Sequence, residues 1–155
     1  MFRQFAAAAG LHLTPRSVRS LAPPKPDLSC RIDGDPIYFE ITRMSHARSA
    51  DAMGRHLSAL SKGIASRPPA ADTYDDRAAL RDAISRKEMR TYATDGCRLG
   101  LLVWVDGVYH PSGMPAAWAR TILAEMGPAG RWTEIWVFDR SLNRVLGLWR
   151  QSVRQ

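Results

Sequence analysis

Several features that define common protein classes are scarce in this chain. Its 155 residues include two cysteines, Cys30 and Cys97, which are too few for a disulfide framework. No run approaches the roughly 18–20 apolar residues that cross a bilayer. The N-terminal segment has only a short alanine run, too weak for the apolar core of a signal peptide. We therefore expect a cytoplasmic protein without a membrane partner.

Common catalytic motifs are also missing. The four histidines form no His-x-x-x-His motif, and the two cysteines form no Cys-x-x-Cys motif. Their spacing therefore argues against a zinc site. The sequence contains no glycine-rich phosphate loop, nucleophile elbow or dinucleotide fingerprint. These absences exclude the simplest assignments to nucleotide-binding, dehydrogenase or serine-hydrolase classes.

Basic residues are abundant, and arginine greatly outnumbers lysine among them. The formal charge is +7, and Lys25, Lys62 and Lys87 are the only lysines among 22 basic residues. Arginine suits bidentate phosphate contacts, so the excess favours a polyanionic partner, with nucleic acid ahead of an anionic surface. A GC-rich coding sequence produces the same bias. Hydrophobic residues at 45% and charged residues at 24% indicate one globular domain over residues 1–155.

The stretch from Pro26 to Thr42 predicts a β-hairpin. Asp33-Gly34 is a favoured dipeptide for a two-residue turn with positive φ at both positions, and apolar and polar residues alternate around it. Two residues then lie opposite each other and share a face when their residue numbers add up to the same total as those of Asp33 and Gly34. The apolar face carries Leu28, Cys30, Ile32, Ile37, Phe39 and Ile41, and the polar face carries Asp27, Ser29, Arg31, Tyr38, Glu40 and Thr42.

The polar face brings two carboxylates together. We expect Asp27 opposite Glu40, with Cβ atoms roughly 4.5–5.5 Å apart. Like charges this close destabilise a fold unless a cation or proton neutralises one of them, and Mg²⁺ is commonly held by one or two carboxylates. The alternative is that Asp27 only begins a strand and Glu40 is a solvated side chain on a wet face.

Two helices are expected after the hairpin, over residues 45–64 and residues 72–92. In the second, Lys87 lies within about 20° of Leu80 on the core-facing stripe. Burying an unpaired ammonium costs on the order of several kcal/mol. Lys87 therefore either extends its stem to solvent or reaches an acidic site. The first helix presents apolar residues on one face: Ala50, Met53, Leu57, Leu60 and Ile64.

The rest of the chain completes an α/β (α+β) pattern. Residues 99–105 form a nearly continuous apolar run, typical of a central strand buried on both faces. Residues 132–138 and 145–149 predict two more strands, and residues 2–11 a short helix. A further helix over 115–126 is expected to direct Trp118, Ile122 and Met126 inward. The order predicts a mixed sheet covered by helices in a single domain.

With these elements in place, the chain resembles the PD-(D/E)xK phosphodiesterase superfamily, which has the restriction-endonuclease-like fold. The resemblance covers about residues 26–106 and rests on Pro26-Asp27, Glu40-Ile41-Thr42, the helix containing Lys87, and the apolar strand. It implies a mixed central sheet flanked by helices. It also implies that Asp27 and Glu40 bind Mg²⁺ or Mn²⁺, helped by the backbone carbonyl of Ile41, and that the metal activates water.

The sequence departs from the family pattern in two places. The family's lysine two residues after the glutamate is Thr42 here, and Lys87 is the only lysine whose expected position allows it to replace that charge. Many members also carry a glutamate on the first helix, but no acidic residue precedes Asp27, and Gln4 is a candidate neutral ligand.

These observations lead to the hypothesis of a metal-dependent nuclease that acts on nucleic acid, DNA more than RNA. Asp27, Glu40 and Lys87 are the candidate catalytic residues, and Tyr38 and Thr42 are candidate supporting groups on the same strand face. The candidate phosphate contacts are Arg43, Arg48, Arg55, Arg86 and Arg90.

Two alternatives remain open. One is a catalytically silent nuclease-like module that binds nucleic acid or a protein partner, as a homodimer or a subunit of a larger complex. The other is a small structural or regulatory protein whose basic surface reflects codon usage.

Overall fold

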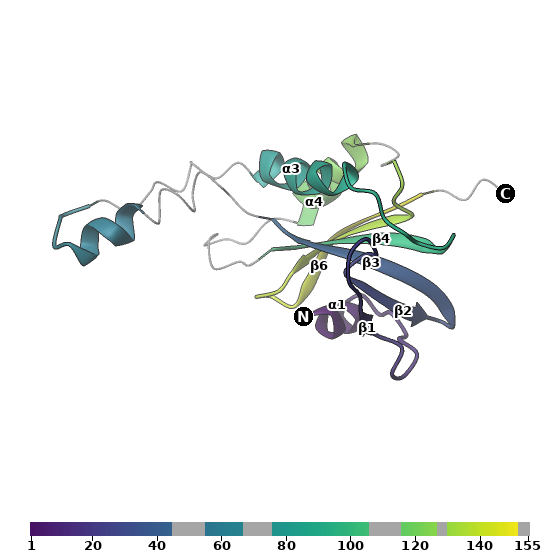
Figure 1. Cartoon of the computed structure of the whole chain (residues 1–155). Helices are drawn as coiled ribbons and strands as arrows, with labels where there is room; N and C mark the ends of the chain where they lie inside the picture. Colours follow the sequence, from purple (N-terminus) through teal and green to yellow (C-terminus); the bar gives the residue numbers. More distant parts are fainter. Residues whose placement is uncertain (45–54, 67–75, 106–115, 127–129, 152–155) are drawn as a thin grey trace.

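The structure is a computed structural model that describes residues 1–44, 55–66, 76–105, 116–126 and 130–151 (Figure 1). Residues 55–61 are helical, and no described helix is long and apolar enough to cross a membrane. The remaining elements, in chain order, are α1 (Phe2–Ala8), β1 (Arg19–Ser20), β2 (Leu28–Ile32), β3 (Asp35–Arg43), α3 (Asp76–Glu88), β4 (Arg98–Val105), α4 (Ala116–Glu125), β5 (Glu134–Asp139) and β6 (Arg144–Arg150).

The described strands form one mixed sheet in the order β1-β2-β3-β4-β5-β6. The pairs β3–β4 and β4–β5 are parallel, and the other pairs are antiparallel. Parallel neighbours need a crossover connection, and α3 and α4 lie in these two connections. The α/β prediction is therefore confirmed at the level of a mixed sheet covered by helices. The short strand β1 was not predicted.

The hairpin has the predicted register. Leu28 pairs with Phe39 and Cys30 with Ile37, as the turn position requires. Asp33 and Gly34 have φ values of 51° and 89°, which is the positive-φ turn expected from the dipeptide. The register matters for the site, because it decides which side of the sheet each carboxylate occupies.

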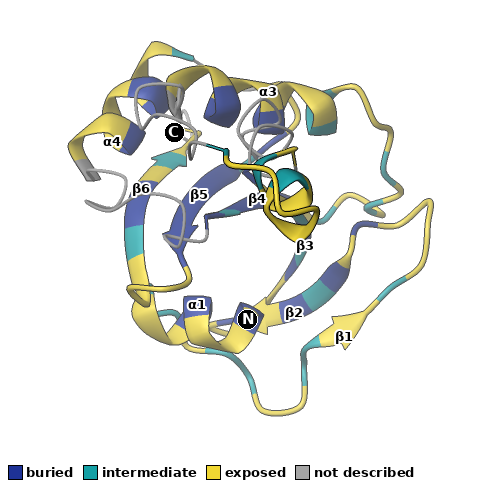
Figure 2. Cartoon of the chain, turned by 90° about the vertical axis from the view of Figure 1, so that its left-hand side faces the viewer, coloured by how far each residue is buried: buried dark blue, intermediate teal, exposed yellow. Residues whose placement is uncertain are grey.

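Each face of the sheet has its own core. Figure 1 shows α3 and α4 on one side of the sheet and α1 on the other. The α1 side contains Phe5 and Phe39, and the α3–α4 side contains Leu80 and Ile122. Buried residues are concentrated in the strands, while much of the helical surface is exposed (Figure 2). As predicted, β4 is buried on both faces, with every residue from Leu99 to Val103 buried.

One apolar side chain that was predicted to point inward is exposed. Trp118 is 38% exposed, with the Arg77 guanidinium 5.7 Å from its ring centroid, while Ile122 on the same helix is fully buried. The apolar residues Leu57, Leu60 and Ile64, at and after the helix over residues 55–61, are also exposed. Helical periodicity identified an apolar face here but not a partner for it. The first part of that predicted helix, residues 45–54, lies outside the described residues.

Candidate active site

Two hydrogen bonds hold Asp27 and Glu40 side by side at the start of β2. The Asp27 backbone N–H donates to Glu40 Oε2 at 3.2 Å, and the Ile41 backbone N–H donates to Asp27 Oδ2 at 2.7 Å. Each carboxylate therefore accepts a backbone hydrogen bond from the other strand of the hairpin. These bonds fix both side chains at the place where the ladder between β2 and β3 ends.

Glu40 is buried under α3, whereas Asp27 is exposed. Only 2% of Glu40 is accessible, because its side chain projects from the middle strand β3 toward the helix-covered face. This burial rules out the alternative that Glu40 is a solvated side chain. A buried carboxylate needs hydrogen bonds or a cation to compensate for lost hydration.

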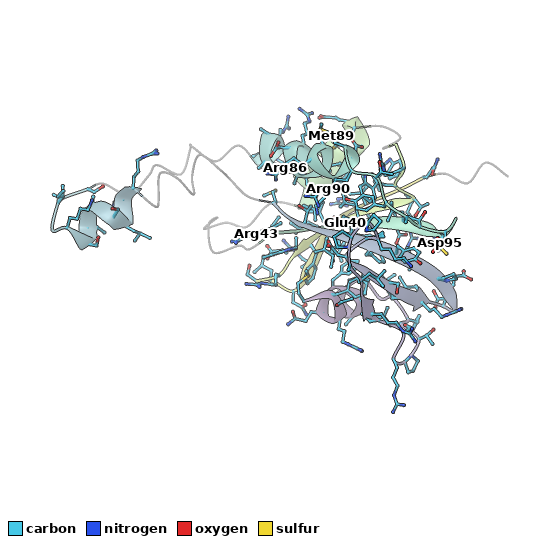
Figure 3. The ribbon with its side chains drawn as sticks, in the orientation of Figure 1. Glu40, Arg43, Arg86, Met89, Arg90 and Asp95 are labelled. Atoms are coloured by element: carbon cyan, nitrogen blue, oxygen red, sulfur yellow. The ribbon has the colours of Figure 1, made fainter. Side chains whose placement is uncertain are left out.

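Lys87 supplies that cation. Its Nζ lies 2.5 Å from Glu40 Oε1, and its side chain is only 14% exposed. Of the two possibilities left by the helical pattern, the structure therefore shows the one in which the lysine reaches an acidic group. Arg90 adds a weaker contact, with Nη1 3.8 Å from the same oxygen and a side chain that is 64% exposed. Figure 3 shows Arg90 close to Glu40 below α3.

Tyr92 completes the surroundings of the carboxylates and was not among the predicted site residues. Its hydroxyl is buried and forms no hydrogen bond of ordinary geometry within the described part of the chain. Burial raises the pKa of Tyr92 most, and the charges of Glu40 and Asp27 raise it further. The helix predicted to run to residue 92 ends at Glu88, so Tyr92 lies beyond α3 and the predicted helical periodicity does not apply to it.

Tyr38 and Thr42 flank Glu40 on the same strand face, as predicted. Both are half-buried, and Tyr38 packs against the core beneath α3 and α4. Neither side chain donates a hydrogen bond to Asp27 or Glu40 in the described structure. The supporting role of these two residues at a metal-bound site therefore stays a prediction.

The predicted phosphate-binding arginines are spread over several surfaces. Arg86 and Arg90 project from the end of α3 near Glu40 (Figure 3), although Arg86 also pairs with Asp82 at 3.4 Å. Arg43 stacks over Trp104 at 5.1 Å, and strand alternation places it on the side of the sheet opposite Glu40. Arg55 is exposed on the helix over residues 55–61, and Arg48 lies outside the described residues.

The donor set of the pair suits a hard cation. Asp27 has a second carboxylate oxygen without a partner among the described residues and is open to solvent, and Glu40 stands beside it. Mg²⁺ is usually held by one or two carboxylates with several waters.

No larger acidic cluster joins this pair. The described residues contain no group of three or more histidine, cysteine, aspartate or glutamate side chains that could hold a metal. Gln4 cannot serve as a ligand beside Glu40, because α1 packs on the opposite face of the sheet against Phe39. The proposed neutral ligand is therefore wrong.

The other two buried carboxylates of the described chain have structural partners. Glu134 accepts from Arg98 at 3.1 Å and lies 3.3 Å from Arg150, across neighbouring strands. Asp139 Oδ1 accepts hydrogen bonds from Ser141 and Leu142 and closes the turn after β5. Glu40 differs because its neighbours are a second carboxylate, an ammonium and a tyrosine hydroxyl.

The comparisons with known proteins leave the site to be interpreted from its geometry. No family model, curated protein or solved structure matches this chain.

Proposed function

We propose that this protein is a metal-dependent nuclease of the restriction-endonuclease-like type that hydrolyses phosphodiester bonds of nucleic acid, with DNA as its preferred substrate. The observation that carries the proposal is the Asp27–Glu40 pair, joined by reciprocal backbone hydrogen bonds and contacted by Lys87. Two adjacent carboxylates and an ammonium are the groups that such hydrolysis requires.

In this proposal, Asp27 and Glu40 hold Mg²⁺ or Mn²⁺, together with the backbone carbonyl of Ile41. A bound metal ion would lower the pKa of a coordinated water and offset negative charge on the phosphate. Lys87 provides a mobile positive charge in place of the family lysine that is Thr42 here. Its ammonium can donate a hydrogen bond to a non-bridging phosphate oxygen as it leaves Glu40.

Substrate binding would rely on the exposed cations around the end of α3. Arg90 is the nearest to the carboxylates, with its guanidinium largely in solvent, and Arg86 lies one helical turn before it. Arginine contacts to phosphate position a strand without reading its sequence. The net charge of +7 favours association with a polyanion.

The test is cleavage of plasmid, linear, single-stranded and RNA substrates with Mg²⁺ or Mn²⁺. We expect Asp27→Asn, Glu40→Gln and Lys87→Ala each to reduce cleavage by more than the about 10–100-fold typical of residues that only support a ligand. Asp35→Asn, at the exposed opposite end of β3, is the matched control and should retain activity. Activity that survives Glu40→Gln in folded protein would overturn the assignment.

A catalytically silent module is the second candidate, and one observation favours it. Lys87 already neutralises Glu40 directly, so the buried carboxylate needs no metal for the fold to be stable. Such a protein would retain DNA in a salt-sensitive manner without cleaving it. Calorimetric titration with Mn²⁺ separates the two, because only the nuclease should show binding that Asp27→Asn abolishes.

A further inference from the structure

A cavity of about 700 Å³ opens beside Tyr92. It lies between the end of α3, the start of β4 and the segment before β5, and its walls combine apolar and polar groups. Pockets that bind small organic groups commonly measure about 300–1,000 Å³ and have this mixed character. Its lining includes Glu88, Tyr92, Thr94, Leu99, Met126 and Arg131.

Two opposite charges line this cavity without being paired. Glu88 is half-buried at the end of α3, and its Oε1 would lie 4.0 Å from a Cβ built on Gly130. The guanidinium of Arg131, the next residue, lies 5.9 Å from the Tyr92 ring centroid. Within the described part of the chain, neither Glu88 nor Arg131 forms an ion pair.

The end of α3 links this cavity to the candidate active site. Successive helical side chains point about 100° apart. Lys87 therefore turns toward Glu40 while the adjacent Glu88 turns toward the cavity. Tyr92 contributes to both the cavity and the candidate active site. It lines the cavity, and the charge of Glu40 raises the pKa of its buried hydroxyl.

We infer that this cavity binds a nucleobase of the strand whose phosphate lies at Glu40, and that the base is guanine. The inference rests on the proposed function, since it identifies what the same site would recognise. Tyr92 lines the cavity, and Lys87, which contacts Glu40, is the residue next to Glu88 of the cavity wall. We therefore place the base and the phosphate of one nucleotide on the two sides of this part of the chain. The Tyr92 ring centroid lies 5.9 Å from the Trp132 ring centroid and 5.9 Å from the Arg131 guanidinium, and the part of the ring that lines the cavity offers a surface on which a base can stack.

The two charges select the base. Guanine presents two neighbouring acceptors, O6 and N7, that suit a bidentate arginine. On another edge it presents two neighbouring N–H donors that a carboxylate can accept together. No other DNA base offers paired acceptors and paired donors on separate edges. Arg131 and Glu88 are the groups that would read these two edges.

The test is metal-free calorimetric titration of the full chain with dGMP, dAMP, dCMP, dTMP and deoxyribose 5-phosphate. We expect dGMP to bind more tightly than the other nucleotides, and the sugar phosphate to bind weakest. Glu88→Gln and Arg131→Gln should each weaken dGMP binding about 10–100-fold, the usual discrimination from a bidentate base contact. Equal binding of all five compounds, or a preference for another base, would overturn the inference.

Matched variants separate loss of the cavity from loss of the fold. Arg3→Gln on α1 changes an exposed charge on the opposite face of the sheet and should leave dGMP binding unchanged. Thr94→Phe should fill the cavity and abolish binding while the protein keeps its cooperative thermal transition. Binding that survives Thr94→Phe in folded protein would show that dGMP occupies another place and would contradict the inference.

The inference and the proposed function fail differently. Cleavage that depends on Asp27, with no binding of dGMP, would support the nuclease function and refute the guanine site. Binding of dGMP that requires Glu88 and Arg131, with no cleavage under any metal condition, would support the cavity and leave the binding-module alternative.

Discussion

Removing the ammonium of Lys87 should destabilise the protein more than removing any exposed lysine. Lys87→Met keeps most of the side-chain volume but leaves the Glu40 carboxylate, which is 2% exposed, without its contact at 2.5 Å. Breaking a buried ion pair by removing one partner typically costs about 3–5 kcal/mol. We expect a value near the lower end, about 3 kcal/mol, because the Asp27 N–H and Arg90 still contact Glu40.

The size of the effect makes it easy to measure. For a chain of 150–250 residues, each kcal/mol lowers the melting temperature by about 2–4 °C, so a fall of about 6–12 °C is expected. Urea denaturation followed by tryptophan fluorescence gives the free energy of unfolding directly. Lys25→Met is the control, because Lys25 is 47% exposed and meets Asp95 only at 4.0 Å. Surface pairs of that kind contribute about 0–1 kcal/mol.

A double-mutant cycle tests the cause. Glu40→Gln together with Lys87→Met removes both charges, so the pair should cost less than the sum of the two single changes. We expect a coupling energy of about 2 kcal/mol for side chains in direct contact. If Lys87→Met costs no more than Lys25→Met, or if the two changes at Glu40 and Lys87 add without coupling, the ion pair does not stabilise this site.

Four further predictions concern Gly100, Cys30 and Tyr92. Gly100→Ala should lower the free energy of unfolding by about 1–3 kcal/mol in urea, because its Cβ would lie 2.5 Å from the Phe39 ring, and an unchanged value would contradict this packing. Burial raises the pKa of Cys30 to about 12, so at mild alkaline pH a thiol reagent should modify Cys97 and not Cys30 until urea is added. Because unfolded Cys30 ionises near pH 9 and the native thiol does not, stability should be full below pH 9 and fall as the pH rises toward 12, a fall that Cys30→Ala should reduce. The raised pKa of Tyr92 predicts that one tyrosine titrates only at strongly alkaline pH in the native protein, and an absorbance titration of Tyr92→Phe should lack this late step.

The hairpin and its register could be predicted from sequence because their determinants are local. Asp33-Gly34 fixes the turn, and a two-residue turn leaves a single pairing that buries one apolar face. From this alone, Asp27 and Glu40 were expected side by side. The central strand from Leu99 was equally clear, since a continuous apolar run of that length suits a strand covered on both faces.

The sequence could not decide contacts between elements distant along the chain. Helical periodicity placed Lys87 on the core-facing stripe, but only the packing of α3 on β3 shows that its ammonium reaches Glu40. The same periodicity predicted that Trp118 points inward, but this side chain is exposed. An apolar face reports that burial is favourable and does not specify what covers it.

Irregular segments were the least predictable part of the site. Tyr92 lies past the end of α3, in a segment without periodicity, yet its hydroxyl is buried near the carboxylates. The cavity beside it is formed by residues from four parts of the chain, including Glu88 and Arg131. Such a site depends on tertiary packing, which no spacing of residues in the sequence encodes.

The Lys87–Glu40 ion pair has opposite consequences for the two proposed functions. Its ammonium stabilises a buried carboxylate, but it would also repel a divalent cation bound to Asp27 and Glu40. An approaching phosphate attracts the same ammonium away from Glu40. In a nuclease, metal and nucleic acid should therefore bind cooperatively, since each reduces the cost of binding the other. In a binding-only module, Lys87 stays on Glu40 and Mn²⁺ has no effect on DNA affinity beyond that of equal ionic strength.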